Sequence, residues 1–227
     1  ASDFLSGLQA GFMEADLANK LFKAYGLPSL PMRLATTGEE AAQAAAELGF
    51  PVALKVASPE IAHKSDVNGV LLDVQDAEAV RQGFAQITAN ARQARPTANI
   101  LGVHVQRMLP DGQDVIIGAL QDVTFGPLVM FGSGGVEVEG LKDVAFALAP
   151  LTRADADFLL RSTWAGRKLE GFRNLPPADR EAVQEALFRL GQMAADLPRL
   201  VEIEINPLRV LPQGQGAVAL DIRIRAA

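Results

Sequence analysis

Two short segments of the chain hold residues that could take part in phosphoryl transfer. The first is HKSD (63–66), and Lys55 lies eight residues before its histidine. The second is EIEINPL (202–208), which Asp221 follows. A lysine can neutralise phosphate, an imidazole can carry a phosphoryl group, and amide and carboxylate oxygens are ligands for Mg²⁺. Because phosphoryl transfer needs mainly positioning and neutralisation of charge, these residues predict that chemistry.

The composition excludes several other kinds of function. The 227 residues are 49% hydrophobic, enough to bury the core of one large domain or of two lobes. A net charge of −6 with scattered basic residues argues against binding to nucleic acid or to an anionic membrane. The absence of cysteine and the presence of only two histidines exclude disulfides, thiol catalysis and multi-histidine metal sites. Since no apolar run approaches the ~20 residues of a membrane span, we expect a soluble cytoplasmic protein.

Hydrophobic periodicity predicts a small α/β lobe in the first half of the chain. Lys55 falls on the polar face of a strand in this lobe, where a surface lysine is the alternative interpretation. His63 falls in a polar loop over 58–69, where it could also be an ordinary loop residue. We expect helices over 14–25, 37–48 and 76–91, and strands over 52–56, 70–74 and 100–108.

The second half mixes strands and helices again and ends in a β-hairpin. A glycine-rich turn over 132–135 lacks the Gly-Lys-Ser/Thr of a phosphate-binding P-loop. Thr152 with Asp155 forms a capping box for one helix, and Pro176 and Pro177 mark the start of another. We expect strands over 114–120 and 128–131, helices over 152–162 and from 176 onward, and a hairpin of 200–211 with 217–225.

The spacing in the closing hairpin predicts a geometry. In its first strand apolar residues alternate with Glu202, Glu204 and Asn206, which gives one apolar and one polar face. If the connection is the four residues 212–215, Asn206 lies directly opposite Asp221 with both side chains on one face. The carboxylate of Glu204 would project from that face two residues away. Two or three such oxygen ligands, with nucleotide phosphates and water, would hold Mg²⁺.

The same register offers an alternative, a solvated ladder of charges. It would pair Glu204 with Arg223 and Glu202 with Arg225 across the hairpin. Pro207 favours the functional interpretation, because a proline in mid-strand removes a ladder donor and is avoided unless a bulge or an edge is needed there. The apolar face of the second strand would carry Val218, Leu220, Ile222 and Ile224.

These segments, taken with the sequence around them, resemble the ATP-grasp domain of the nucleoside-diphosphate-forming acyl-CoA synthetases. That family includes the β subunit of ADP-forming acetyl-CoA synthetase and, more distantly, the β subunit of succinyl-CoA synthetase. The resemblance extends from about residue 15 to residue 225. It is carried by AYGLP (24–28), GFPVALKVASPEIAHKSDVNGV (49–70), VQRMLPDGQDVIIG (105–118), FGPLVMFGSGGVEVEGLKDVAFALAPL (125–151), and EIEINPL with ALDIRI (219–224).

The resemblance implies an α+β (α/β) fold of the ATP-grasp type, in which the nucleotide lies between two mixed lobes. The small lobe would be an insertion over 38–105. The second lobe would combine 13–37 with 106–227, and 1–12 would be a linker or terminal arm. CoA-binding or α-type domains, which this chain does not contain, would be its partners in the same parent chain or as a separate subunit.

The resemblance also assigns residues to the nucleotide. Lys55 would contact phosphate, and Asp114 would hold the ribose. Asn206 and Asp221 would bind Mg²⁺, which accompanies ATP or ADP as substrate. The hinge whose backbone meets adenine would consist of Gln106, Arg107, Met108 and Leu109.

Two residues would have catalytic roles by the same resemblance. His63 would take a phosphoryl group from a partner histidine and deliver it to ADP, and Glu204 would stand beside the metal. The reaction would be acyl-CoA + ADP + phosphate giving acid + CoA + ATP, or its reverse. This chain would be a partial catalytic unit of that acid–thiol ligase.

Four positions depart from the family pattern. Asp114 stands where the family usually has glutamate, and Ala147 where it often has arginine. Glu137 and Gly140 replace apolar residues. An alternative therefore stays open, a regulatory or vestigial nucleotide-binding module of a larger acyl-CoA-binding or protein-acetyltransferase polypeptide. A carboxylate–amine ligase on the same fold would have no use for His63.

Overall fold

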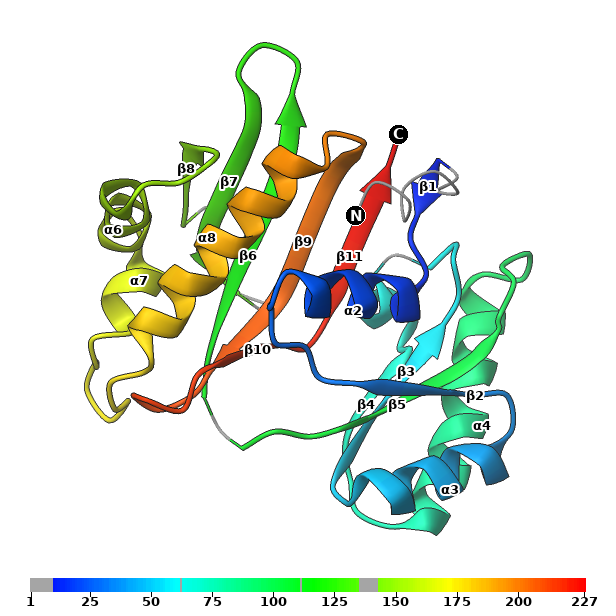
Figure 1. The fold of residues 1–227 in the computed structure, drawn as a ribbon. Helices are drawn as coiled ribbons and strands as arrows, with labels where there is room; N and C mark the ends of the chain where they lie inside the picture. Colours follow the sequence, from blue (N-terminus) through cyan, green and yellow to red (C-terminus); the bar gives the residue numbers. More distant parts are fainter. Residues whose placement is uncertain (1–9, 62, 111, 135–142) are drawn as a thin grey trace. The chain divides into compact units, whose positions relative to one another are not determined.

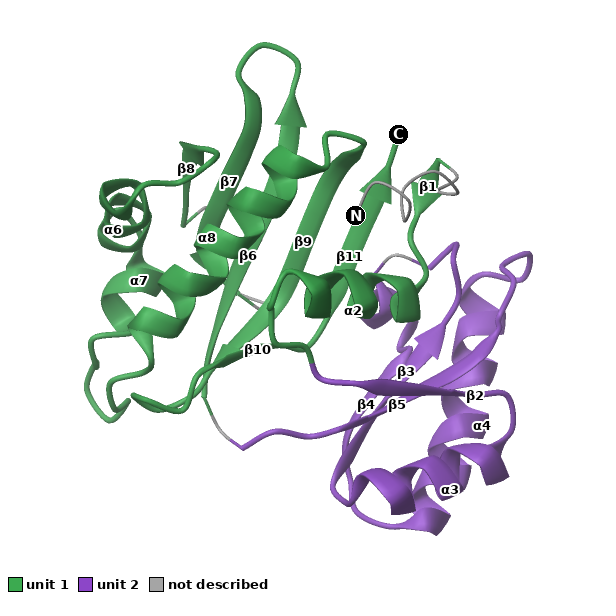
Figure 2. Cartoon of the chain, viewed as in Figure 1, with its two compact units in different colours: residues 1–29, 111–227 green, residues 30–110 purple. Residues whose placement is uncertain are grey.

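The computed structural model describes residues 10–61, 63–110, 112–134 and 143–227. The chain divides into two compact units, a smaller one over 30–110 and a larger one that combines 1–29 with 111–227 (Figure 2). The smaller unit thus includes 30–37 and 106–110 in addition to the insertion expected over 38–105. These added residues belong to it because strand β2 (Met32–Ala35) pairs along strand β5 (Gly102–Arg107).

The smaller unit is a four-stranded antiparallel sheet with two helices. The strand order is β2-β5-β3-β4, where β3 is Val52–Ala57 and β4 is Val70–Val74. Helices α3 (Gly38–Leu48) and α4 (Ala77–Ala94) pack on each other and on this sheet (Figure 1). Both begin at a side-chain cap, since the Thr37 hydroxyl accepts from the Glu40 amide at 3.2 Å and the Asp76 carboxylate from the Ala79 amide at 2.8 Å.

The larger unit contains a seven-stranded antiparallel sheet. Six strands follow in the order β1-β11-β9-β6-β7-β8, and β10 (Ala217–Ala219) pairs with β9. The helices of this unit bury their apolar residues in one core with the sheet, which includes Phe131, Leu187 and Ile205. The strands are β1 (Gly11–Phe12), β6 (Gln113–Asp122), β7 (Gly126–Ser133), β8 (Val144–Leu148), β9 (Leu200–Val210) and β11 (Ile222–Ala226). The helices are α2 (Ala15–Ala24), α6 (Arg153–Ser162), α7 (Trp164–Lys168) and α8 (Arg180–Asp196).

The mixed α+β class and most predicted elements are confirmed. The capping box of α6 is present, with the Asp155 amide donating to the Thr152 hydroxyl at 3.3 Å and the Thr152 amide to the Asp155 carboxylate at 2.8 Å. The predicted start of α8 at the two prolines is wrong. The helix begins at Arg180, because Asp179 accepts from the Ala182 amide and caps it there.

Among the α-helices and strands of the described residues, four were not predicted, namely β1, β2, α7 and β8. Three of them are too short to show a period, and β8 reads VAFAL with no polar residue to reveal an alternation. The linker expected over 1–12 lies mostly outside the described residues, but Gly11 and Phe12 pair with β11. Among the helices that the structure describes, none is long and apolar enough to cross a membrane.

Candidate active site

The closing hairpin has the register that the sequence predicts. Asn206 lies opposite Asp221, and its amide donates to the Asp221 carbonyl at 3.1 Å. Ile205 pairs with Ile222 directly beside them, and β10 continues the same register beyond them. The two strands are joined through 212–215, where the Gln215 amide donates to the Pro212 carbonyl. An amide oxygen and a carboxylate are therefore placed on facing positions of one ribbon.

Asn206 and Pro207 form a bulge on β9. On the neighbouring strand β6, Val115 pairs with Leu208 and Ile117 with Ile205, so two residues of β9 stand opposite the one residue between them. The bulge that Pro207 predicted is confirmed. An extra residue reverses the alternation of the strand, so buried residues occur at 203 and 205 before the bulge and at 208 and 210 after it.

The predicted apolar face of the second hairpin strand is wrong in part. Ala217 and Ala219 are buried on β10, whereas Ile224 and Ala226 are buried on β11. The strand is interrupted at Leu220 and Asp221, opposite the bulge, and the alternation changes there as well. The sequence pattern was interpreted as one unbroken strand and therefore placed Val218 and Leu220 on the wrong face.

The charge ladder exists only at one end of the hairpin. Glu202 pairs with Arg225 at 3.0 Å and with Arg223 at 4.0 Å. The Arg223 guanidinium also lies 4.5 Å from the centre of the Phe12 ring. Although Glu204 is opposite Arg223 in register, no ion pair of Glu204 occurs within the described residues. The ladder hypothesis thus accounts for Glu202 and leaves Glu204 beside Asn206 without explanation.

Asp114 has a partner that the sequence did not reveal. Arg209 lies directly opposite it across β6 and β9, and its Nε and Nη2 donate to the two carboxylate oxygens at 2.5 and 3.1 Å. The two residues are 95 positions apart. Their contact depends on the pairing of β6 with β9, which no local sequence pattern shows.

Lys55 is held by a buried glutamine. Its Nζ donates to Gln106 Oε1 at 2.9 Å, and Gln106 Nε2 donates to the Leu30 carbonyl at 3.0 Å. Gln106 is only 2% exposed. Lys55 itself is half-buried, and its head group has a protein partner in Gln106. The side chain of Gln106 was also missed, since the sequence assigned only its backbone to the hinge.

In the rest of the predicted hinge, Arg107 is the last residue of β5, and Met108 and Leu109 follow the strand. Arg107 is exposed, while Met108 and Leu109 are half-buried. The Met108 amide donates to the Pro51 carbonyl at 3.0 Å, and its sulfur accepts from the Asp73 amide. These contacts fix the segment against the smaller unit.

His63 is exposed at the start of a 3₁₀ helix, Lys64–Val67, in a segment expected to be loop throughout. The far end of that segment is anchored, because the Gly69 amide donates to the Lys64 carbonyl at 2.8 Å and its carbonyl accepts from Val56. A Cβ at Gly69 would lie 2.6 Å from Val56 Cγ1, so no larger residue fits without movement. The imidazole is thus presented to solvent beside a fixed anchor.

The glycine-rich turn packs against backbone. A Cβ at Gly134 would lie 2.5 Å from the Val115 carbonyl carbon, which supports tight packing as its purpose. Ala147 packs against the core of the larger unit. Glu137 and Gly140, the other departures from the family pattern, lie outside the described residues.

Asp143, just before β8, is a further polar centre. Its carboxylate accepts from the Trp164 and Ala165 amides at 2.7 and 2.8 Å and from the Ser133 hydroxyl at 2.8 Å. Burial, the largest single influence, raises its pKa, but these hydrogen bonds and the charge of Arg167 together hold the pKa of Asp143 below its ordinary value.

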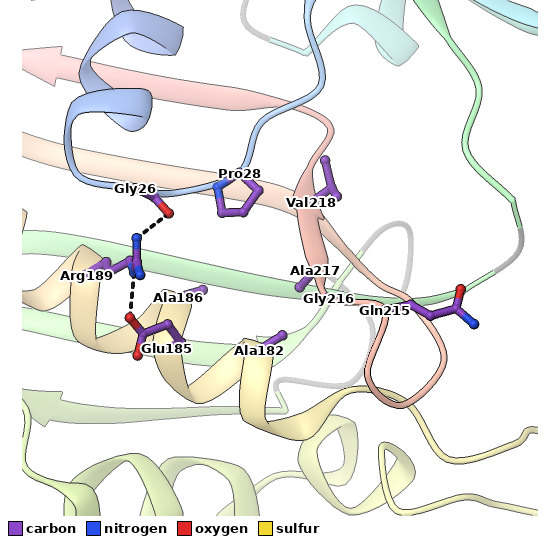
Figure 3. A pocket seen from close by; sticks show the side chains of 10 residues that line it. All are labelled: Gly26, Pro28, Ala182, Glu185, Ala186, Arg189, Gln215, Gly216, Ala217 and Val218. Carbon is purple, nitrogen blue, oxygen red and sulfur yellow. Dashed lines mark hydrogen bonds and ion pairs between the residues drawn. The ribbon is translucent and has the colours of Figure 1, made fainter.

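A shallow hollow of about 240 Å³ lies elsewhere on the larger unit (Figure 3). Arg189 crosses it, donating to the Gly26 carbonyl at 2.6 Å and to Glu185 at 2.7 Å. None of the residues predicted to carry chemistry lines it. In the part of the chain that the structure describes, no group of three or more His, Cys, Asp or Glu residues could hold a metal ion.

Comparison with known proteins identifies the family. A family model described as the ATP-grasp domain matches residues 9–226. The chain belongs to the ATP-grasp family. The β subunit of ADP-forming acetate–CoA ligase I from Pyrococcus furiosus is 41% identical over 207 residues, which are 91% of this chain and 88% of that subunit. The ADP-forming acetate–CoA ligase I of Archaeoglobus fulgidus is also 41% identical, but the match covers 87% of this chain and 29% of that longer protein.

Solved structures show the same ATP-grasp relationship. The dinucleotide-forming acetyl-coenzyme A synthetase 1 of Ca. Korarchaeum cryptofilum, in complex with coenzyme A and Ca-AMPCP, matches with a TM-score of 0.90 and 39% identity, over 96% of this chain and 94% of that chain. A second structure of that enzyme, with Mg-AMPPCP and a phosphohistidine segment that points towards the nucleotide-binding site, matches with a TM-score of 0.80 and 37% identity, over 95% and 93% of the chains.

Proposed function

We propose that this ATP-grasp domain is the nucleotide-binding part of an ADP-forming acyl-CoA synthetase. The reaction is acyl-CoA + ADP + phosphate giving acid + CoA + ATP, or its reverse. The observation that carries the proposal is the register of the closing hairpin, in which Asn206 lies opposite Asp221 and two residues from Glu204. A charge ladder accounts for Glu202, but Glu204 forms no ion pair within the described residues. The identity to ligase β subunits over 91% of the chain supports the same activity.

The proposal assigns nucleotide contacts to both units. In the smaller unit, Lys55 neutralises phosphate from a position fixed by Gln106, and 106–109 meets adenine. In the larger unit, Asp114 accepts hydrogen bonds from the ribose. Asn206 and Asp221 would hold Mg²⁺, since their oxygens are the hard donors that this ion prefers. One carboxylate is enough, because the phosphates of the nucleotide supply further negative ligands. The ion would supply neutralisation of the phosphates.

His63 is proposed to carry the phosphoryl group. In the direction of ATP synthesis, the bond between its imidazole nitrogen and phosphorus breaks while the terminal phosphate oxygen of ADP forms the new bond to phosphorus. Its exposure, and the anchor at Gly69 behind it, suit a group that must meet two reaction partners. Lys64, the next residue, would offset the negative charge of the phosphoryl group.

The partners are proposed to be CoA-binding domains. The Archaeoglobus fulgidus ligase carries further sequence in one chain, and the Pyrococcus furiosus relative is a separate β subunit. Either arrangement would supply the acid and CoA half of the reaction. A cytoplasmic location is part of the proposal, because ADP and CoA are available there.

One observation favours a second candidate, a regulatory nucleotide-binding module. Ala147, which packs against the core of the larger unit, stands where the family often has a cation. Such a module would bind nucleotide without phosphoryl transfer, so transfer distinguishes the two candidates.

Transfer can be tested in the direction from ATP to histidine. The purified chain is incubated with Mg·ATP, and intact mass and peptide mapping locate the added phosphate. We expect one acid-labile phosphate on His63, lost in His63→Ala and in EDTA. The other histidine gives a matched control, since His104→Ala should keep the modification. Binding of ATP without any phosphate on His63 would favour the regulatory module.

A further inference from the structure

Arg209 is placed on the face of Asp114 by the bulge. An unbroken alternation from Ile203 and Ile205 would turn residue 209 towards the core. The extra residue reverses the alternation, so Leu208 and Val210 are buried at 1% and 0% exposure while Arg209 stands on the opposite face. The bulge that contains Asn206 therefore also determines the face on which Arg209 lies.

The contact between Arg209 and Asp114 is fixed on several sides. The guanidinium meets both carboxylate oxygens, and the two side chains are only 20% and 32% exposed. Gly112 makes room for the aliphatic part of Arg209, because a Cβ there would lie 2.6 Å from Arg209 Cδ and 2.6 Å from the Val210 carbonyl oxygen. A forked pair of this kind holds the carboxylate in one orientation.

The pairing leaves Asp114 able to accept further hydrogen bonds. A carboxylate has about four lone-pair positions, of which the guanidinium takes two. The other two can accept from two neighbouring hydroxyls, which is what the 2′,3′-diol of a ribose offers. Arg209 also neutralises a negative charge that would otherwise repel nucleotide phosphates. Arg209 is three residues along the strand from Asn206, which corresponds to roughly 10 Å at the rise of a β-strand. A nucleotide whose sugar contacts the Asp114–Arg209 pair could therefore extend its phosphates to a metal ion at Asn206.

We propose that Arg209 is a positioning residue that orients Asp114 and thereby sets a preference for ribose over 2′-deoxyribose nucleotides. The inference rests on the proposed function, because it needs a nucleotide to bind at Asp114. A site built to hydrogen-bond a hydroxyl rejects the analogue that lacks it, since its polar group is then left unpaired. The shorter side chain of Asp114, compared with the glutamate usual in the family, makes a fixed orientation more important.

The test compares affinities for Mg·ADP and Mg·2′-deoxy-ADP by calorimetry. The parent chain should bind ADP about ten-fold more tightly, as expected for one hydrogen bond to a charged group. Arg209→Met should reduce that ratio to about three-fold or less, mainly by weakening ADP. Arg209→Lys should give an intermediate ratio, because it keeps the charge but not the fork. Asp114→Asn changes the acceptor itself, and its ratio of ADP to 2′-deoxy-ADP affinity is the reference with which the Arg209 variants are compared.

Arg225→Met is the matched control, because it removes a comparable ion pair with Glu202 on the same sheet. It should leave the ratio unchanged. If Arg209→Met lowers thermal stability and weakens both nucleotides equally, the role is structural and the inference is wrong. If the parent binds both nucleotides equally, the inference fails while the proposed function stands. If the parent binds neither, both fail. Should Arg209→Met not fold, the ratio in Arg209→Lys decides, and an unchanged ratio overturns the inference.

Discussion

At the scale of single residues, the candidate site depends on polar side chains that hold other polar side chains. Gln106 holds Lys55, and Arg209 holds Asp114. In both pairs the residue expected to meet the nucleotide is fixed by a neighbour on the adjacent strand. Such fixing reduces the conformational entropy that binding would otherwise cost.

Gln106→Leu tests the first of these pairs. The change removes the acceptor of Lys55 Nζ and the donor to the Leu30 carbonyl, both of which are partly buried. We expect a loss of about 1–3 kcal/mol in the free energy of unfolding, and weaker binding of Mg·ADP. Gln82→Leu on α4 is the control, since its exposed bond to Glu78 should be worth under about 0.5 kcal/mol. Equal losses from the two changes, measured by denaturant unfolding, would contradict the proposed role of Gln106.

Asp221→Ala tests the metal ligands. The side chain is half-buried next to the bulge, and its removal should abolish the difference in ADP affinity between Mg²⁺ and EDTA while the protein stays folded. Arg223→Ala, on the same strand, should keep that difference. If both changes reduce it equally, the charge ladder is the better explanation of this hairpin.

Residue types and spacing were enough to predict part of this site and not the rest. The facing of Asn206 and Asp221 follows from the four-residue connection of the hairpin, which is visible locally. The Asp114–Arg209 pair requires β6 to lie beside β9, which no local pattern shows. The side chain of Gln106 was missed because a polar residue between Val105 and Arg107 is expected on the solvent-facing side of a strand until the sheet is known to bury it.

At the scale of elements, the bulge on β9 and its counterpart at Leu220–Asp221 divide the hairpin into two parts of opposite alternation. Pro207 predicted the bulge on β9, but no residue type predicted the interruption of the partner strand at Leu220 and Asp221. Asp143 organises a second junction, where Ser133 at the end of β7 and the first amides of α7 meet on one carboxylate. The sequence predicted neither α7, whose first amides this carboxylate accepts from, nor β8, which begins at the next residue.

Asp143→Asn should therefore loosen that junction and change the acid response. The amide keeps one carbonyl oxygen, so about 1–3 kcal/mol of stability at neutral pH should be lost. Because the folded-state pKa of Asp143 is depressed, its contribution is present above the unfolded value of about 3.9 and is lost as pH falls through the folded value. Unfolding curves between pH 7 and 2 should accordingly converge at the acid end. Asp16→Asn on α2, which is exposed, should run parallel to the parent.

At the scale of the whole molecule, two hydrophobic cores stabilise two units. One core gathers residues of α3, α4 and the four-stranded sheet, and the other gathers those of the seven-stranded sheet and its helices. The chain passes between the units only at 29–30 and 110–111. Each unit can therefore lose its packing without a direct change in the core of the other.

Leu54→Ala tests that independence. Leu54 is fully buried in the core of the smaller unit, and its truncation should cost about 2–5 kcal/mol there. Hydrogen exchange followed by mass spectrometry should show faster exchange within 30–110 and near-parental exchange in β6, β7 and α8. Leu187→Ala, equally buried in the other core, is the matched control and should give the reverse pattern.

If the proposed function is right, Mg·ADP should slow exchange both around Lys55 and around Asn206 in the parent. Leu54→Ala should then weaken ADP binding, because Lys55 is on the strand whose packing it loosens. If hydrogen exchange in Leu54→Ala or Leu187→Ala became faster to the same extent in both units, the two cores would unfold together and the independence of the units would be disproved.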